Sequence, residues 1–479
     1  MASPLSGTGK LACAFIVPDA TTNLGDVLPR WTESHLSAPA IIITPNTEDD
    51  IVAAIHLAKQ NNLNIVPGGG GHGTFTTIDN KTAYLDLRNF NDIQLDQASS
   101  TVRLQAGVRT GSLLKYLVAQ GYYTTIPNSN AVGAVGAILG GGNTSQNGLH
   151  GFMIDNVLSF RVITAEGKAV EVGSSSTGED LALFYALCGA GHGLGVVMAA
   201  TMKAYPISSL HLTENKLWTR VLMFPPSAIN DVVEAYCSFD PPAVPLNVQI
   251  TFLCSPPGAP AAGSPIIVLS ATYYGPSEDA EKAAAKLFEA ILVGKAFKAD
   301  QALVPLSNIN DAFEPLNAHG GFKSMNAARI KNLAPQAIKE SFSKWAQVME
   351  ELPDAARTAV VFYKFNPDKL RANGDIKEIE NRFLEGRDRG STAIATTWCA
   401  APASRDRLGD FVDEFFTICR SADKVPPRTF ANTMKLGVDL GELFQEEKVE
   451  ELQRVKEYWD PNGVFWSPYK PVLTNQTRI

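Results

Sequence analysis

A run of four glycines followed by His-Gly most limits how this chain can fold. The run spans Pro67–Gly73, with the single histidine at His72, and it follows the apolar segment Leu63–Val66. Glycine lacks a Cβ, so its backbone N–H groups can close on a phosphate. No Gly-Lys-Ser or Gly-Lys-Thr follows, which excludes a Walker loop. The pattern predicts a strand followed by a ligand-binding loop.

Two further glycine-rich runs lie downstream. Ala131–Asn143 is apolar and dense in glycine, and Gly189–Gly195 has a glycine at every second position. Neither fits G-x-G-x-x-G between a strand and a helix with an acid downstream, so a nicotinamide dinucleotide fold is disfavoured. A flexible connector would explain one such loop. Three of them, each tied to a strand, favour close approach of the backbone to a large ligand.

Length and composition narrow the class of protein. The chain has 479 residues, which favours two domains or three, and its 45% apolar residues suffice for large cores. The net charge of −8 comes without a basic face, so we expect no nucleic-acid partner. No apolar run approaches the roughly 18 residues of a membrane span, so we expect no membrane partner.

The N-terminus and the cysteines bear on the compartment. Leu11–Val17 is apolar but short, and Pro18-Asp19 follows it in place of a cleavage site, so we expect a short strand and not a signal peptide. The six cysteines are scattered without a C-x-x-C pair. They predict free thiols in a reducing compartment, and we expect a cytoplasmic protein without a metal site.

The first 205 residues alternate between strand and helix patterns. Thr47–Asn61 predicts a helix, with Thr47 as its cap and Asp50 three residues on. Val157–Gly173 predicts a hairpin that turns at Glu166-Gly167. Gly111–Gln120 predicts a second helix. Further strands are expected at Ala40–Thr44, Leu63–Val66, Tyr84–Leu87, Thr101–Gln105 and Gly195–Tyr205.

The character of the sequence changes after Pro206. Strand patterns now mix with amphipathic helices, which predicts an antiparallel sheet backed by helices. Phe297–Met325 has little periodicity and is expected to form an ordered excursion at the domain junction. The expected strands are Trp218–Phe224, Leu246–Leu253, Ile266–Tyr274, Thr358–Phe365 and Ser391–Trp398, and the expected helices are Ser227–Ser238, Ser277–Val293, Pro335–Leu352 and Arg405–Arg420.

These motifs together resemble a known family. Gly70-Gly71-His72 after a strand is similar to the covalent-flavin loop of the vanillyl-alcohol oxidase and p-cresol methylhydroxylase (PCMH) type of flavoproteins, in particular their berberine bridge enzyme-like subgroup. The resemblance spans roughly residues 25–206 and 430–470. It continues in Tyr84–Leu87, Gln105–Val108, Gly133–Gly142, Asp155–Gly167, Leu183–Val197 and Tyr458–Phe465.

The resemblance implies an α+β, two-domain FAD-binding fold of the PCMH type. Residues 1–206 would bind FAD, 207–424 would form a substrate domain whose antiparallel sheet roofs the flavin, and 425–479 would return to the FAD-binding domain. FAD would be held covalently through His72. The cofactor-binding residues it implies are Gly69, Gly70, Gly71, His72, Gly73, Ser129, Val132, Gly133, Gly136, Gly142, Asn143, Val196 and Tyr469.

The sequence departs from the family pattern at four places. Gly68-Gly69 stands where most members have Arg-Ser. Ser129 stands where many members have a second flavin-linking cysteine, which predicts one covalent link. Phe430-Ala-Asn432 replaces a Tyr-x-Asn motif, so the phenol often credited with proton abstraction is missing. Tyr469-Lys-Pro471 replaces the usual Gln-Ser-Ile. The last two changes leave the proton chemistry open.

Three histidines, His72, His150 and His192, lie in or near the predicted cofactor loops. A histidine in a glycine loop is ordinarily only tolerated there. With the other motifs present, attachment of His72 to the flavin 8-methyl group is the better interpretation, and it would give a permanently bound, more oxidising flavin. His150 and His192 are expected to be structural, hydrogen-bonded residues.

Oxidation requires a group that removes a proton while hydride leaves for the flavin. Tyr363 is the first candidate, on the expected strand Thr358–Phe365, where related enzymes carry active-site side chains. Alternation places it on the face opposite Phe362 and Lys364. A tyrosine acts as a base only if its pKa is lowered, and Lys364 or the flavin could help. Packing of Tyr363 in the sheet is an equally good interpretation. Asn432 and Lys364 are further catalytic candidates, and Gln249 and Trp398 are expected to line the pocket.

Three functions remain open. The leading one is an oxidase that takes hydride from a small organic substrate, a secondary-metabolite intermediate, and is reoxidised by O₂ to give H₂O₂. The second is a flavoprotein with a net non-redox reaction, isomerisation or cyclisation. The third is a binding protein that kept only the fold, which the intact His72 and glycine loops disfavour.

Overall fold

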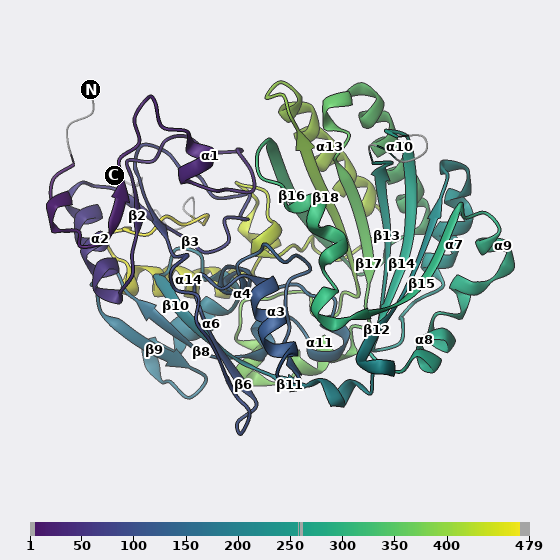
Figure 1. Cartoon of the computed structure of the whole chain (residues 1–479), viewed down its shortest axis with the longest axis horizontal. Helices are drawn as coiled ribbons and strands as arrows, with labels where there is room; N and C mark the ends of the chain where they lie inside the picture. The colour runs from purple at the N-terminus through teal and green to yellow at the C-terminus, as the bar shows by residue number, and fades with distance from the viewer. Residues whose placement is uncertain (1–4, 257, 259–261, 470–479) are drawn as a thin grey trace.

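A computed structural model describes residues 5–256, 258 and 262–469, and it consists of two lobes (Figure 1). The N-terminal lobe comprises residues 5–206 together with a C-terminal return, 430–469. Its first sheet has the order β1-β2-β4-β3 and its second β5-β6-β10-β8-β9. The strands are β1 (Ala14–Ile16), β2 (Ile41–Thr44), β3 (Asn64–Gly68), β4 (Thr82–Asp86), β5 (Ile93–Asp96), β6 (Thr101–Gln105), β8 (Val157–Ile163), β9 (Ala169–Gly173) and β10 (Val196–Lys203), and β7 (Tyr122–Tyr123) pairs with β11 (Tyr205–Pro206).

Two helices of this lobe, α2 (Glu48–Gln60) and α3 (Thr110–Val118), form where the sequence predicts them. Helix α2 begins after a capping box in which Thr47 and Asp50 satisfy each other's backbone N–H groups. The strands β8 and β9 form the predicted hairpin, and Gly167 takes a φ of 74° in its turn. The helices that were not predicted are α1 (Leu24–Val27), α4 (Ala134–Leu139), α5 (Asn147–His150) and α6 (Gly178–Ala190).

The sheet lobe, residues 207–429, is built on seven antiparallel strands. Their order is β15-β12-β14-β13-β17-β18-β16, which places β16 at the edge next to the N-terminal lobe (Figure 1). The strands are β12 (Lys216–Phe224), β13 (Leu246–Cys254), β14 (Pro265–Tyr273), β15 (Lys298–Pro305), β16 (Phe322–Ile330), β17 (Ala359–Lys364) and β18 (Ser391–Cys399).

Helices cover only one face of this sheet. Helices α7 (Ile229–Cys237), α10 (Pro335–Glu351) and α13 (Ser404–Cys419) share a core with Ile250, Phe252, Phe362 and Ala395 of the strands. The remaining short helices are α8 (Ser277–Ala283), α9 (Ala290–Val293), α11 (Asp368–Gly374) and α12 (Lys377–Glu380). The antiparallel sheet backed by helices is thus as predicted from the sequence.

Two expectations were wrong in detail. The helix expected over Ser277–Val293 is broken into α8, a 3-10 turn at Ala285–Phe288 and α9. Phe297–Met325 is not a single excursion, because its ends are the strand β15 and the start of β16. Only the stretch between them, residues 306–321, crosses between the two edges of the sheet, and it contacts the N-terminal lobe through hydrogen bonds such as Asn310 Nδ2 to the Pro127 carbonyl, 3.1 Å.

The edge strand β16 is closed by groups of the N-terminal lobe and of the segment leading into it. Thr32 Oγ1 donates to the Lys323 carbonyl (2.9 Å) and accepts from the Lys323 N–H (2.8 Å). Thr74 Oγ1 accepts from the Met325 N–H at 3.4 Å, and Thr429 Oγ1 donates to the Ala327 carbonyl at 2.6 Å. Unpaired edge groups are a liability, so these hydroxyls fix the sheet against the other lobe.

The C-terminal return completes the N-terminal lobe. Helix α14 (Glu446–Trp459) packs against α6, and Phe465 pairs in parallel with Ile65 of β3. The turn Asp460–Gly463 is held by the Asp460 carboxylate, which accepts from the N–H groups of Val464 and Phe465. The strand that precedes His72 is therefore anchored by residues almost 400 positions away in the chain.

All six cysteines are free thiols, as expected, and five of them are buried. In the described part of the chain, no helix is long and apolar enough to cross a membrane.

Candidate cofactor and active site

The first two glycine loops meet backbone to backbone. A Cβ on Gly70 would lie 2.2 Å from the Gly133 nitrogen, and a Cβ on Gly133 would lie 2.6 Å from the Gly70 nitrogen. A Cβ on Gly69 would similarly lie 2.5 Å from the Ala106 carbonyl. Glycine is therefore required here for the loops to pack on each other, a reason that the sequence alone did not reveal.

One position of the second loop leaves the backbone accessible. Gly136, in α4, is exposed, and nothing lies within 4 Å of a Cβ built there. Val132 and Asn143 are half-buried at the two ends of this stretch. Gly142 takes a φ of 72° and rests on Met153. Within this largely buried stretch, Gly136 leaves room for a ligand to approach the backbone closely.

His72 is oriented by an indole and by backbone contacts of residues 29–31. The Trp31 ring lies nearly parallel to the imidazole, with centroids 5.2 Å apart and planes at 12°. The backbone N–H of Trp31 donates to the Gly71 carbonyl (3.1 Å), and the Arg30 side chain donates through Nη2 to the Gly73 carbonyl (2.6 Å). The imidazole Nε2 is buried and has no hydrogen-bond partner in the part of the chain that the structure describes.

The surroundings of His72 keep its imidazole neutral. Burial, together with the nearby basic groups Arg30, His319, Arg109 and Lys323, lowers the pKa of His72 to about 3. A neutral imidazole has a free nitrogen lone pair at physiological pH. This is the protonation state that bond formation to a flavin carbon requires.

Ser129 lies near the other side of the loops. Its Oγ donates to Asn317 Oδ1 at 2.7 Å, and the neighbouring Asn130 Nδ2 donates to Asp311 and Glu314. Ser129 thus joins the second glycine loop to the crossing segment 306–321.

Tyr363 points from β17 toward the N-terminal lobe. It belongs to the core that this lobe shares with the sheet, whereas its neighbour Phe362 belongs to the core under the helices. Its hydroxyl is buried without a hydrogen bond of normal geometry. Burial raises the pKa of Tyr363 to about 12, an increase opposed by Thr392, Arg329 and Asn143 nearby. Tyr363 is therefore a protonated phenol in the protein without ligand.

Lys364 lies on the opposite face. Its ammonium group lies 5.1 Å from the centroid of the Tyr236 ring in α7, beneath the helices. That position does not support the catalytic role predicted for Lys364. Gln249, also predicted to line the pocket, pairs directly with Tyr363 across β13 and β17 and faces the N-terminal lobe.

Asn432 holds the C-terminal return to the second glycine loop. Its Nδ2 donates to the Ala137 carbonyl at 2.6 Å, and its Oδ1 lies 3.3 Å from His192 Nε2. A Cβ on Gly140 would lie 2.0 Å from the same Oδ1. These bonds give Asn432 and His192 structural roles, and Phe430 packs beside them against Phe152, with ring centroids 6.0 Å apart.

The remaining predicted residues lie at the margins of the site. Val196 is fully buried in β10, and Tyr469 is fully buried against Phe444. Lys470 and Pro471 lie outside the described residues. Trp398 lies at the His72 end of the sheet, where the ammonium group of Lys323 sits 3.9 Å from its ring centroid. His150 is hydrogen bonded to the Tyr123 hydroxyl at 2.8 Å, as expected for a structural histidine.

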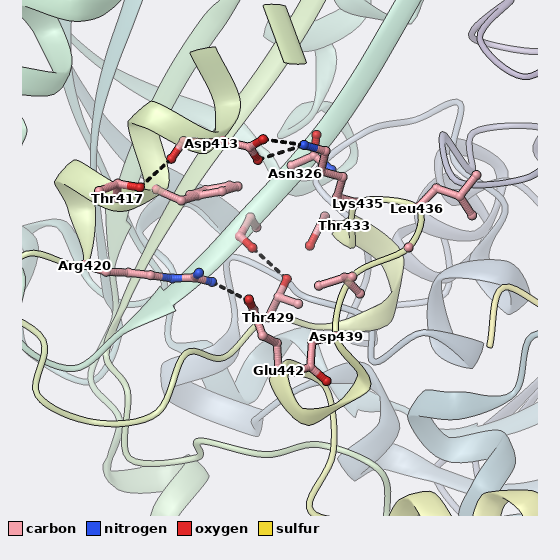
Figure 2. Close-up of a pocket in the computed structure, with 14 residues that line it drawn as sticks. Asn326, Asp413, Thr417, Arg420, Thr429, Thr433, Lys435, Leu436, Asp439 and Glu442 are labelled. Atoms are coloured by element: carbon pink, nitrogen blue, oxygen red, sulfur yellow. Dashed lines mark hydrogen bonds and ion pairs between the residues drawn. The ribbon is translucent and has the colours of Figure 1, made fainter. Parts of the chain in front are cut away.

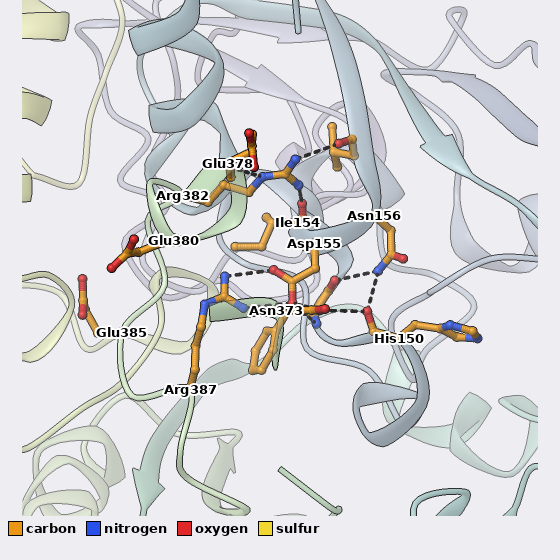
Figure 3. A network of polar contacts seen from close by, with 12 residues as sticks. His150, Ile154, Asp155, Asn156, Asn373, Glu378, Glu380, Arg382, Glu385 and Arg387 are labelled. Atoms are coloured by element: carbon orange, nitrogen blue, oxygen red, sulfur yellow. Dashed lines mark hydrogen bonds and ion pairs between the residues drawn. The ribbon is translucent and has the colours of Figure 1, made fainter. Parts of the chain in front are cut away.

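A buried ion pair joins the lobes at the far end of the site (Figure 3). Arg387 donates two hydrogen bonds of 2.9 Å to the Asp155 carboxylate, which also accepts from Asn373 Nδ2 at 3.1 Å. Arg382 donates to the carbonyls of Ile154 and Val157. These contacts hold residues 373–387 against the N-terminal lobe. They give the Asp155-Asn-Val-Leu158 motif a structural role at the junction of the two lobes.

Two surface hollows lie on the helix side of β16, away from Tyr363. One, of about 440 Å³, is lined by charged groups that neutralise each other: Arg420 with Glu442 at 2.7 Å and Lys435 with Asp413 at 2.7 Å (Figure 2). The other, of about 510 Å³, reaches Thr74 and Phe75. Neither hollow is lined by a residue of the two glycine loops, so we assign the reaction to the opposite face of the sheet.

Several residues of the site carry no signal in the sequence. Trp31 and Arg30 contact the His72 loop from 41 to 43 positions away, and Trp31 Nε1 donates to the Leu316 carbonyl, 285 positions away. Thr392 and Arg329 complete the row of Tyr363 across three strands. The neighbours of Tyr363 in this row could be identified only once the pairing register of the sheet was known.

Comparison with known proteins agrees with this geometry. A family model described as FAD binding domain matches residues 39–173. The FAD-linked oxidoreductase hasG of Aspergillus fumigatus is 28% identical over 467 residues, covering 95% of this chain and 96% of that protein. The solved structure of Physcomitrella patens BBE-like 1 superposes with a TM-score of 0.80 at 16% identity, covering 97% and 98% of the two chains. That of 6-hydroxy-D-nicotine oxidase from Arthrobacter nicotinovorans gives 0.78 at 20% identity, covering 98% and 99%.

Fold and site together define an FAD-linked oxidoreductase. Residues 39–173 match an FAD binding domain, and the fold of the whole chain is that of solved berberine bridge enzyme-like proteins. The resemblance predicted from the sequence is confirmed, and so is the two-domain α+β fold.

Proposed function

We propose that the protein is an oxidase that holds FAD covalently through His72 and oxidises a small intermediate of secondary metabolism, with O₂ as the final acceptor and H₂O₂ as product. FAD, when bound, supplies the hydride acceptor and the site of reaction with O₂. The observation that carries the proposal is the half-buried, neutral imidazole of His72, whose Nε2 has no hydrogen-bond partner among the described residues, next to the two glycine loops that pack on each other.

A single covalent link follows from Ser129. A hydroxyl cannot replace a cysteine thiolate in forming a bond to the flavin ring, and this hydroxyl already donates to Asn317. The residues that would hold the cofactor are those of the two glycine loops, and His72 would be the sole covalent anchor. We also propose a cytoplasmic location, which the six free thiols support.

The four strands next to the N-terminal lobe supply no obvious base. Strands β13, β17, β18 and β16 contain no Asp, Glu or His. Together with Phe430 in place of a phenol, this favours substrates whose proton leaves easily. It also keeps a second candidate open, in which the flavoprotein catalyses a net isomerisation or cyclisation.

Reoxidation distinguishes the two candidates. The purified holoprotein would be reduced by light with EDTA in the absence of air and then mixed with air-saturated buffer. An oxidase regains its yellow absorbance and releases one H₂O₂ per flavin. A flavin that stays reduced in air would contradict the oxidase and favour the non-redox reaction.

A further inference from the structure

The sheet presents a small apolar patch to the N-terminal lobe. Met325 pairs with Thr396 on adjacent strands, and Val361 pairs with Ile394 in the next row. All four side chains are half-buried, whereas the residues that alternate with them, such as Val360 and Ala395, are fully buried under the helices. The patch therefore retains accessible surface on the side where the flavin is proposed to bind.

The next row of side chains beyond this patch contains polar groups that form no hydrogen bond of normal geometry within the described chain. Tyr363 pairs with Thr392, which pairs with Arg329. The three residues are 5%, 0% and 0% exposed, yet among the described residues the Tyr363 hydroxyl, the Thr392 hydroxyl and Arg329 Nε form no hydrogen bond of normal geometry, although Thr392 and Asn143 lie close enough to the Tyr363 hydroxyl to oppose the rise in its pKa. Buried polar groups are almost always paired in proteins, so three orphans in one row point to a ligand that supplies the missing acceptor.

The charge of this row favours an oxygen acceptor. The guanidinium of Arg329 donates to the carbonyls of Glu385 and Arg389 but forms no ion pair with a carboxylate in the described chain. Tyr363 remains a donor at neutral pH, since burial raises its pKa to about 12. Nothing on the four adjacent strands would neutralise a cationic ligand, because they contain no acid.

We infer that the substrate places a neutral aromatic or otherwise apolar ring against Met325, Val361, Ile394 and Thr396, and that a hydroxyl or carbonyl oxygen on that ring accepts hydrogen bonds from Tyr363 and Thr392. This inference rests on the proposed function and specifies its substrate class. A cationic amine would lack a counter-ion here. A sugar would leave most of its hydroxyls against the apolar patch without partners.

Ligand binding to the holoprotein tests the class directly. Three probes would be titrated: 2-naphthol as a neutral aromatic hydroxyl compound, benzylamine as a cation and cellobiose as a sugar. Binding would be followed by the change in flavin absorbance and, independently, by quenching of tryptophan fluorescence. We expect 2-naphthol to bind at least tenfold more tightly than either of the others.

Two phenylalanine variants locate the oxygen contact. Tyr363→Phe should weaken 2-naphthol binding by about tenfold, the effect of one lost hydrogen bond. Tyr236→Phe is the matched control, because it removes an equally buried and unpartnered hydroxyl on the helix side of the sheet. It should leave binding unchanged.

The outcomes separate this inference from the proposed function. Tighter binding of cellobiose or benzylamine, or equal effects of the two variants, would overturn the substrate class even in a fully flavinylated enzyme. Flavin-free protein that still prefers 2-naphthol by fluorescence would support the class and contradict the covalent oxidase.

Discussion

The imidazole of His72 and the indole of Trp31 lie 12° from parallel, with ring centroids 5.2 Å apart. Trp31 is itself held by the sheet lobe. Its indole Nε1 donates to the Leu316 carbonyl at 2.7 Å, and Lys323 Nζ donates to the backbone carbonyl of Trp31 at 2.6 Å. The ring that stacks on the proposed flavin anchor is thus held in part by hydrogen bonds that exist only when the two lobes are docked.

His72→Ala should abolish covalent attachment while leaving the glycine loops intact. Wild-type protein denatured in acid should retain its yellow colour in the precipitate, and the variant should release FAD into solution. Mass spectrometry of wild-type digests should find flavin on the His72 peptide alone. A flavin-bearing cysteine peptide, or complete release of FAD from wild type, would disprove the single histidine link.

Trp31→Leu should reduce the fraction of protein with acid-stable flavin several-fold, because the imidazole loses the ring that fixes its plane. Trp31→Phe keeps an aromatic ring and should restore most of the attachment. The measurement is in-gel flavin fluorescence relative to stained protein. If Trp31→Leu attaches flavin as completely as wild type, the stack has only a packing role.

Gly70→Ala should prevent correct folding of the loops, since its Cβ would lie 2.2 Å from the Gly133 nitrogen. Backbone atoms cannot move aside as a side chain would, so we expect a loss of about 3 kcal/mol or more in stability. Gly136→Ala is the control, because its Cβ meets nothing within 4 Å. It should keep the melting temperature of the apoprotein and impair only FAD binding. Equal melting temperatures for Gly70→Ala and wild type would refute the contact.

The sequence predicted the parts of the site that depend on local pattern. The glycine loops, the capping box at Thr47 and the alternation that separates Tyr363 from Lys364 all follow from spacing over a few residues. Alternation tells which residues share a face of the sheet but not which face the cofactor occupies. The structure places Lys364 beneath the helices, a position that does not support its predicted catalytic role.

What the sequence missed depends on tertiary contacts. The edge strand β15 has no periodicity because it is largely exposed on both faces. The sequence of strand β16 has a polar pattern because it contains two buried charged residues. Lys323 lies between Trp31 and Trp398, and Arg329 donates to backbone carbonyls. A buried lysine or arginine in a strand contradicts the polarity pattern on which strand prediction relies.

Acid should destabilise the apoprotein through its buried neutral histidines. Burial lowers the pKa of both His192 and His150 to about 4, below the ordinary value of 6.5. Below pH 6.5 the unfolded chain binds protons that the folded protein does not, so stability is full above pH 6.5 and falls until about pH 4. Each group contributes at most about 3 kcal/mol to this loss.

His192→Asn should flatten that acid limb, because asparagine does not titrate and can still bond to Asn432. Denaturant unfolding of wild type and variant at pH 7 and pH 4.5 measures the difference. An unchanged slope in His192→Asn would mean that the histidine protonates freely in the folded protein.

Tyr363→Phe decides how the sheet takes part in the reaction. If Tyr363 binds the substrate oxygen, its loss should mainly weaken binding. In anaerobic stopped-flow experiments with a compound that reduces the flavin, the apparent Kd should rise about tenfold, while the limiting rate of flavin reduction falls by less than tenfold. If Tyr363 is the general base that its strand position predicts, its loss should instead lower the limiting rate by about 10²–10⁴. The phenol pKa of about 12 favours the first outcome, because a group that holds its proton donates a hydrogen bond readily but accepts a proton only after ionising. Tyr236→Phe, which lies beyond reach of the flavin side of the sheet, should change neither quantity.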